Sequence, residues 1–238
     1  VAMGKAGTVA EAELLLRSVR ATSTAAIALH LVVSSGTQAA AEELIRRAHR
    51  QAWHSAETTR VDVEQVEALA SRVVPGFNTS LHHTGPFGAA KTFLHRFLPN
   101  VRQCIYIDTD MLMLDDVAAL WAQFADFGPR TLMQLPLTDI PERGFKLSAG
   151  RMSTPSSSSH MCSCISLMHL ERMRGSLEPL LSAAWAGMPE ATRSDPHAYR
   201  ASNQGLLYFA IIRAQQTWPP AGSVAAAHPP FKHLALGG

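Results

Sequence analysis

The feature that most constrains the fold is a short apolar run that ends in two carboxylates. Residues 104–107, Cys-Ile-Tyr-Ile, form a β-branched and aromatic segment of the kind that is buried on both faces of a sheet. Asp108 and Asp110 follow it directly. In an open α/β sheet, residues at the carboxyl end of a buried strand face the crevice where ligands bind. The run therefore predicts an α/β protein with a ligand site here.

The two carboxylates suit a divalent cation. Hard oxygen ligands favour Mg²⁺ or Mn²⁺, and these ions usually hold substrate phosphates as well. Acidic pairs are also common in turns that bind nothing, so the spacing alone is weak evidence. The context strengthens it, because a second apolar run, 111–114, leads to Asp115 and Asp116, which predict the start of a helix. Together these features favour a metal and phosphate site.

The same segment resembles the Asp-x-Asp signature of the GT-A glycosyltransferases. It is most similar to the retaining family that includes glycogenin, bacterial galactosyl- and glucosyltransferases and glucoside xylosyltransferases (glycosyltransferase family 8). The resemblance implies the GT-A fold, a mainly parallel twisted sheet with helices on both faces. It also implies that Asp108, Thr109 and Asp110 bind a UDP-sugar donor, with Mn²⁺ (or Mg²⁺) held by Asp108 and Asp110.

Composition limits the class of protein. With 238 residues, 47% of them hydrophobic and 17% charged, the chain has the composition of an ordinary globular α/β protein. A net charge of +2 does not favour a nucleic-acid partner. No apolar run reaches the roughly 18 to 20 residues of a membrane span, so none is expected within the chain. Three cysteines do not predict a disulfide framework.

Strands and helices alternate ahead of the acidic motif. Thr8 and Glu11 have the spacing of a capping box that opens a helix. We expect residues 1–238 to form a single GT-A domain that lacks part of the first strand and part of the C-terminal region. The other elements expected in this half are strands at 1–3, 27–33 and 60–63 and a helix over about 38–53.

The segment that precedes the acidic strand carries a candidate donor-binding cation. Residues 88–99 predict a helix that Pro99 ends. In the resembled family, a helix of this form presents a Lys or Arg to the donor nucleotide, and Lys91 occupies that place. A cation beside a diphosphate offsets charge that one metal ion cannot neutralise. The alternative is a solvated helix lysine.

A second stretch, 161–174, is similar to another motif of the same family. There, Asn-Ser-Gly or Asn-Ala-Gly precedes a strand and a helix with Arg-Met-Arg, and it shapes the donor-sugar pocket. Ser163 is retained here, but Cys162 and Cys164 replace the Asn and the Gly. Cysteine is a poor hydrogen-bond donor and acceptor compared with an amide, so we expect altered donor affinity or catalysis.

Two more family features lie near the C-terminus. Residues 201–212 resemble a motif whose Asp and Gln lie next to the sugar and the site of bond exchange; here they are Asn203 and Gln204, the expected catalytic residues. Asn keeps hydrogen bonding but removes the charge. The family's third metal ligand is a C-terminal His, for which we prefer His233 over His228. That neither binds metal stays open.

These features predict a retaining enzyme that moves a sugar, xylose or glucose, from UDP to a hydroxyl of a glycan or glycosylated protein. The resemblance to xylosyltransferases implies a secretory-pathway lumen, Golgi or ER. One alternative is a catalytically impaired GT-A domain that binds UDP or glycan without turnover. The other is a metal-dependent phosphotransfer enzyme, which is less favoured because no acidic pair follows an apolar strand after residue 160.

Overall fold

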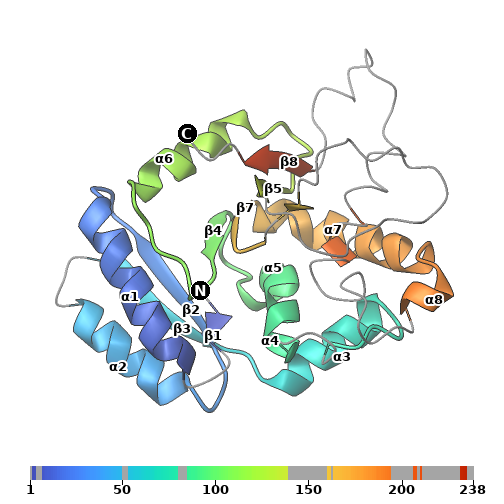
Figure 1. The fold of residues 1–238 in the computed structure, drawn as a ribbon, viewed down its shortest axis with the longest axis horizontal. Helices are drawn as coiled ribbons and strands as arrows, with labels where there is room; N and C mark the ends of the chain where they lie inside the picture. The colour runs from blue at the N-terminus through green and yellow to red at the C-terminus, as the bar shows by residue number, and fades with distance from the viewer. Residues whose placement is uncertain are drawn as a thin grey trace.

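The computed structural model describes residues 2–3, 7–49, 53–79, 85–138, 160–161, 163–193, 206–207, 210 and 231–234. The first sheet in this part of the chain has the order β1-β2-β3, and both of its pairings are parallel (Figure 1). Its strands are β1 (Ala2–Met3), β2 (Ala28–Val33) and β3 (Ser55–Arg60). β1 is short and lies opposite only Val32 and Val33 of β2.

The second sheet has the order β4-β7-β5-β6, with β8 also paired to β5. β4 pairs with β7, β7 with β5, and β5 with β6, all antiparallel, whereas β8 runs parallel to β5. The mainly parallel pairing that we predicted therefore holds in the first sheet, and the second sheet is mixed. Its strands are β4 (Cys104–Ile107), β5 (Met133–Thr138), β6 (His160–Met161), β7 (Ile165–Met168) and β8 (Phe231–Leu234).

Helices cover both faces of the first sheet. Helices α1 (Gly7–Thr22) and α2 (Gln38–His49) pack on the face that carries alternate β2 side chains, among them Leu29 and Leu31. Val32 points the other way and joins a larger core with helix α3 (Val63–Val73). This alternation follows from the two-residue period of a strand. The buried apolar residues of β2 thus explain why the sheet needs a helical layer on each side.

The larger core also includes residues of the segment before β4 and of the long helix after β7. The remaining described helices are α4 (Gly85–Ala90), η1 (Lys91–Phe93), α5 (Leu94–Phe97), α6 (Val117–Ala122), η2 (Gln123–Asp126), α7 (Leu170–Ala186) and α8 (Glu190–Arg193). None of the helices in the described part is both long and apolar enough to cross a membrane.

Several predicted elements differ in their bounds. The helix expected over 88–99 is a series of short turns, with Lys91 on the 3₁₀ turn between α4 and α5. The strand expected at 60–63 is β3, which ends at Arg60, and Val63 begins α3. The helix α1 begins at Gly7, so Thr8 lies inside the helix and not at its N-cap.

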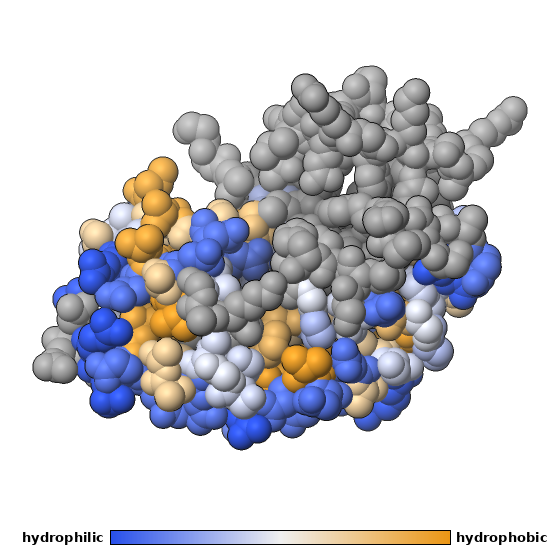
Figure 2. All heavy atoms as spheres, turned by 60° about the horizontal axis from the view of Figure 1, so that its bottom comes forward, coloured by the Kyte–Doolittle hydropathy of each residue, from blue (hydrophilic) through white to orange (hydrophobic). Residues whose placement is uncertain are grey.

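Among the coloured residues of Figure 2, hydrophilic side chains line the lower rim of the face, and hydrophobic patches lie between them. The large hydrophobic side chains that are most exposed in the described part are Leu14, Leu112, Leu114 and Trp121. Leu112 and Leu114 belong to the apolar run after the acidic motif, which is therefore not a buried strand. Met111 and Met113 of the same run do pack against a core.

Candidate functional site

Asp108 lies at the junction of two strands of the second sheet. Its backbone N–H donates to the carbonyl of Cys164 over 2.7 Å, which continues the antiparallel ladder of β4 and β7 by one more pair. The residues that follow β4 and those that precede β7 therefore meet at one end of these two strands, which we call the sheet edge. The site is built around this edge.

Lys91 reaches the same edge from the turn between α4 and α5. Its Nζ lies 3.3 Å from Asp108 Oδ2 and donates to the backbone carbonyl of Ser163 over 3.4 Å. The same ammonium lies 5.6 Å from the centre of the Tyr106 ring, within the range of a cation–π contact. Lys91 is only 7% exposed, so it is not a solvated helix lysine.

Tyr106 holds the other oxygen of the Asp108 carboxylate. Its hydroxyl donates to Asp108 Oδ1 over 2.5 Å. Burial, followed by the negative charges of Asp108 and Asp110, raises the pKa of Tyr106 well above its ordinary value. The hydroxyl thus stays protonated and remains a donor at neutral pH.

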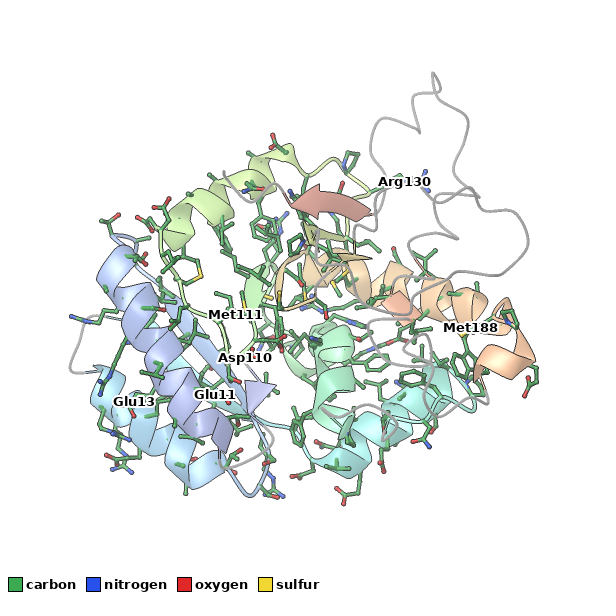
Figure 3. All side chains as sticks on the ribbon, in the orientation of Figure 1. Glu11, Glu13, Asp110, Met111, Arg130 and Met188 are labelled. Carbon is green, nitrogen blue, oxygen red and sulfur yellow. The ribbon has the colours of Figure 1, made fainter. Side chains whose placement is uncertain are left out.

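Glu11 of α1, which packs on the first sheet, contacts the turn formed by residues 108–111. Its Oε2 accepts a hydrogen bond of 3.0 Å from the hydroxyl of Thr109, which is 7% exposed. Figure 3 shows Glu11 pointing from α1 toward the region of Asp110 and Met111. The Met111 N–H donates to the Asp108 carbonyl over 3.4 Å and closes the turn. Asp110 itself is exposed, so a ligand can reach its carboxylate.

Ser163 borders the site from the β7 side. Its side chain is 3% exposed, and its Oγ has no hydrogen-bond partner within the described part of the protein. A buried hydroxyl without a partner is costly, so it marks a place where a ligand atom would be favourable. The adjacent Cys164 is disulfide-bonded, which the sequence did not predict, whereas Cys104 is a free thiol.

The remaining predicted site residues lie outside the described residues. These are Asn203 and Gln204, together with Cys162 and His228. His233 belongs to β8 and pairs with Leu135 of β5, but its side chain is also outside the described part. Among the residues described, no three or more His, Cys, Asp or Glu side chains are grouped to hold a metal ion.

The sequence reasoning missed two residues of the site, Tyr106 and Glu11. Tyr106 could have been found, because residues i and i+2 of a strand point to the same face, which sets its hydroxyl beside Asp108. Glu11 gave no such indication, since it is 98 residues away from Thr109 in the chain. Only the packing of α1 against the second sheet brings it there.

No protein-family model matches the chain, and no curated protein matches it. Solved structures do. The apo form of mouse xyloside xylosyltransferase 1 is 16% identical, with a TM-score of 0.64 over 90% of this chain and 81% of that one. The galactosyltransferase LgtC in complex with donor and acceptor sugar analogues is 18% identical, with a TM-score of 0.64 over 87% and 68%. The apo WbbM bifunctional glycosyltransferase is 9% identical, with a TM-score of 0.59 over 98% and 37%.

These likenesses show the fold. The chain has the GT-A fold of glycosyltransferase structures, and the predicted fold class and fold-level resemblance are confirmed. With identities of 9 to 18%, they say nothing about individual site residues. The chemistry has to be argued from the site itself, because one fold hosts many functions.

Proposed function

We propose that this protein is a glycosyltransferase that moves a sugar from a UDP-sugar donor to an acceptor hydroxyl with retention of configuration. One observation carries the proposal. Lys91, Asp108 and the Ser163 backbone converge where β4 ends and β7 begins, in a GT-A fold. A buried cation next to an exposed acidic turn suits a diphosphate, whose charge needs both a metal ion and a fixed positive group.

The donor set at the turn fits a divalent cation in its chemistry. Asp108 and Asp110 offer carboxylate oxygens of the kind that Mn²⁺ and Mg²⁺ prefer, and His233 is the proposed third ligand. When bound, the ion would act as a Lewis acid that polarises the donor diphosphate. The chain's own residues keep Asp108 in place, because Tyr106 and Lys91 each fix one of its two oxygens.

The other proposed roles concern the sugar. Ser163, with its unpartnered Oγ, would offer a hydrogen bond to the donor sugar. Asn203 and Gln204 would position the sugar at the site of bond exchange, which lowers the barrier by orientation. Xylose or glucose is the proposed donor sugar, and the likeness to a mouse xyloside xylosyltransferase is consistent with a pentose. A glycan or glycosylated protein in the Golgi or ER lumen is the proposed acceptor.

A second candidate function is a GT-A domain that binds UDP or glycan without turnover. The substitutions that favour it are Cys162, Cys164 and Asn203, which replace the amide, the glycine and the carboxylate of the resembled motifs. Cys164 is disulfide-bonded at the position where the motif has glycine. The phosphotransfer alternative has less support, because the similar structures named above are all glycosyltransferases.

Titration calorimetry with UDP, with and without Mn²⁺, tests the proposal. We expect binding that requires Mn²⁺, and we expect Asp110→Ala to weaken it by about 10- to 100-fold, as loss of groups at metal sites commonly does. Asp115→Ala is the matched control, because Asp115 is an exposed carboxylate in the same segment but after the turn. It should bind UDP as the unmodified protein does.

Turnover separates the two candidate functions. Release of UDP from UDP-xylose or UDP-glucose, with water or a xyloside as acceptor, would support the enzyme. Metal-dependent UDP binding without release from any UDP-sugar would favour the impaired domain. If UDP does not bind in any condition, the enzyme fails, and the second candidate fails as well unless the protein binds a glycan.

A further inference from the structure

Lys91 depends on one charged partner. Its Nζ lies 3.3 Å from Asp108 Oδ2, and Asp108 is the only carboxylate that pairs with it among the described residues. Its other contacts are the Ser163 carbonyl, at 3.4 Å, and the ring of Tyr106, whose centre is 5.6 Å away. Because Lys91 is only 7% exposed, water solvates its ammonium group poorly. The ion pair with Asp108 therefore supplies the charge compensation that solvent does not.

The same carboxylate is half of the proposed metal site. Of the two expected ligands, Asp108 and Asp110, only Asp108 forms an ion pair within the described part of the protein. Tyr106 holds the other oxygen, Oδ1, through an uncharged hydroxyl group. A hydroxyl donor does not carry the net charge that repels a cation, whereas an ammonium group does. Any divalent ion that binds Asp108 must therefore compete with Lys91 for the carboxylate.

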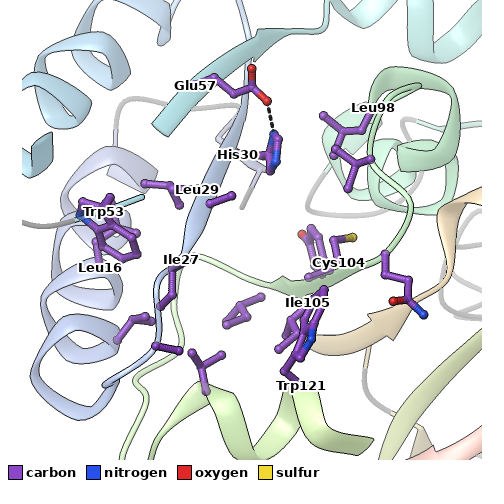
Figure 4. A pocket seen from close by; sticks show the side chains of 18 of the residues that line it. Leu16, Ile27, Leu29, His30, Trp53, Glu57, Leu98, Cys104, Ile105 and Trp121 are labelled. Atoms are coloured by element: carbon purple, nitrogen blue, oxygen red, sulfur yellow. Dashed lines mark ion pairs between the residues drawn. The ribbon is translucent and has the colours of Figure 1, made fainter. Parts of the chain in front are cut away.

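The neighbouring interior offers Lys91 no other anion. A cavity of about 630 Å³ lies between β2 and β4, and Tyr106 is one of the residues that line it (Figure 4). Its walls are mainly apolar, and Glu57, the only carboxylate among the described lining residues, is paired with His30 over 2.6 Å. A buried charge that loses its partner is strongly unfavourable. Metal binding without a second ligand would therefore leave Lys91 uncompensated.

We propose that Lys91 is an exchangeable counter-cation, which neutralises Asp108 in the empty site and passes to the donor diphosphate when a metal ion takes the carboxylate. This rests on the proposed function, since the diphosphate is the anion that the exchange requires. Lys91 loses its charged partner when the metal binds alone, but it gains a new one when UDP binds as well. Tyr106 keeps its bond to Asp108 throughout and preserves the orientation of the carboxylate.

The exchange makes the two ligands cooperative. By linkage, UDP must raise the affinity for Mn²⁺ by the same factor as Mn²⁺ raises the affinity for UDP. Such factors are commonly about 5- to 150-fold. Direct contact between the ion and the diphosphate contributes to this factor in any protein. The contribution of Lys91 is the part that disappears when its side chain carries no charge, so a comparison of variants isolates it.

Lys91→Met is the main test. It keeps an unbranched side chain and removes the charge, so Asp108 is left without a competing cation. We expect this variant to bind Mn²⁺ alone about tenfold more tightly than the unmodified protein, and UDP with Mn²⁺ about tenfold more weakly. The EPR signal of free Mn²⁺ measures the first affinity and calorimetry the second, both corrected for association of Mn²⁺ with UDP in solution. A merely structural lysine would not shift the two affinities in opposite directions.

A second variant and a control accompany it. Lys91→Gln keeps a hydrogen-bond donor for the Ser163 carbonyl, so it should fold if the methionine variant does not, and it should change both affinities in the same directions. Arg102→Met removes one positive charge from an exposed side chain that pairs with Glu171 on the surface. Because solvent and salt screen that charge, both affinities should stay within about twofold. Equal, weaker or undetectable binding of Mn²⁺ alone by the Lys91 variants would overturn the exchange.

The outcomes also separate the exchange from the proposed function. If the unmodified protein binds UDP with Mn²⁺ but neither Lys91 variant gains affinity for Mn²⁺ alone, the donor site is supported and the exchange is overturned. If the variants gain affinity for Mn²⁺ but the unmodified protein never binds UDP, the proposed function is overturned, and with it the transfer of Lys91 to a diphosphate. The ion pair would then remain only as a barrier to metal binding.

Discussion

At the scale of single residues, the site depends on how Asp108 is held. Tyr106 donates to Oδ1 of its carboxylate from within β4, and Lys91 approaches Oδ2 from the 3₁₀ turn η1. Asp108 is partly accessible, with 29% of its side chain exposed, so a ligand can still reach it. The carboxylate is thus fixed before any donor binds, which lowers the entropy cost of binding.

Tyr106→Phe tests this arrangement. The substitution removes one hydroxyl from a buried position and leaves the ring in place, so it should lower the free energy of unfolding by about 2 kcal/mol, as for a hydrogen bond to a charged group. Urea unfolding measures the change. UDP binding in the presence of Mn²⁺ should also weaken, because Asp108 loses one of the groups that orient it.

A double-mutant cycle with Asp108→Asn identifies the cause. If the hydroxyl acts through the carboxylate, the two substitutions should cost less together than the sum of each alone. Additive losses would contradict the proposed link. The sequence could have predicted this pair from strand alternation, but not Glu11, whose contact depends on how the two sheets are placed.

At the scale of elements, two arginines of the predicted second motif fasten α7 to the rest of the protein. Arg174 donates to the backbone carbonyls of His95, Leu98 and Val101, at the end of the segment that carries Lys91. Arg172 donates to the carbonyls of Gly128 and Thr131 ahead of β5. The resemblance suggested that this Arg-Met-Arg pattern mattered, and the structure explains it as support for the backbone.

Arg174→Lys should therefore destabilise the protein more than its conservative nature suggests. A lysine has one ammonium in place of a planar fork, so it cannot serve three carbonyls in the same way. We expect a loss of about 2 kcal/mol in the free energy of unfolding, as for hydrogen bonds that involve a charged group. Chemical denaturation measures it, with the same dependence of the free energy of unfolding on denaturant concentration (m-value) used for both proteins.

Arg102→Lys is the matched control for that substitution. Arg102 is 74% exposed and pairs with Glu171 on the surface, where such pairs contribute about 0 to 1 kcal/mol. It should change stability by much less. Equal losses for Arg174→Lys and Arg102→Lys would contradict the role that we assign to Arg174.

Element boundaries were predictable where a local chemical reason exists. Asp116 was predicted as a helix start, and it is the N-cap of α6, where its Oδ1 accepts from the Ala118 N–H. That bond, followed by those from Thr24, lowers the pKa of Asp116 to about 2. α3 was missed, although Asp62 and Gln65 form a capping box at its start. The β8–β5 pairing depends on distant parts of the chain and could not be read locally.

At the scale of the whole molecule, burial of histidines links stability to pH. Burial lowers the pKa of His30, His95 and His169 below the ordinary value of 6.5. In the unfolded chain these groups would take up protons near that value, so below it the unfolded state binds more protons than the folded state. Stability should then decrease as pH falls from about 7 through 6.5 and continue to fall until the folded histidines titrate.

Tm measured between about pH 7.5 and 5.5 tests this sign, because the window contains the ordinary histidine pKa of about 6.5. His95→Gln should make the decrease shallower, since His95 is 1% exposed and Gln does not titrate. Glu178, the partner of His95, is not the cause in this window. Its pKa is lowered, chiefly by Arg96, so its contribution is lost only below the ordinary range of a carboxyl group. A constant or rising Tm toward pH 5.5 would contradict the prediction, because it would mean that burial does not lower the pKa of the three histidines.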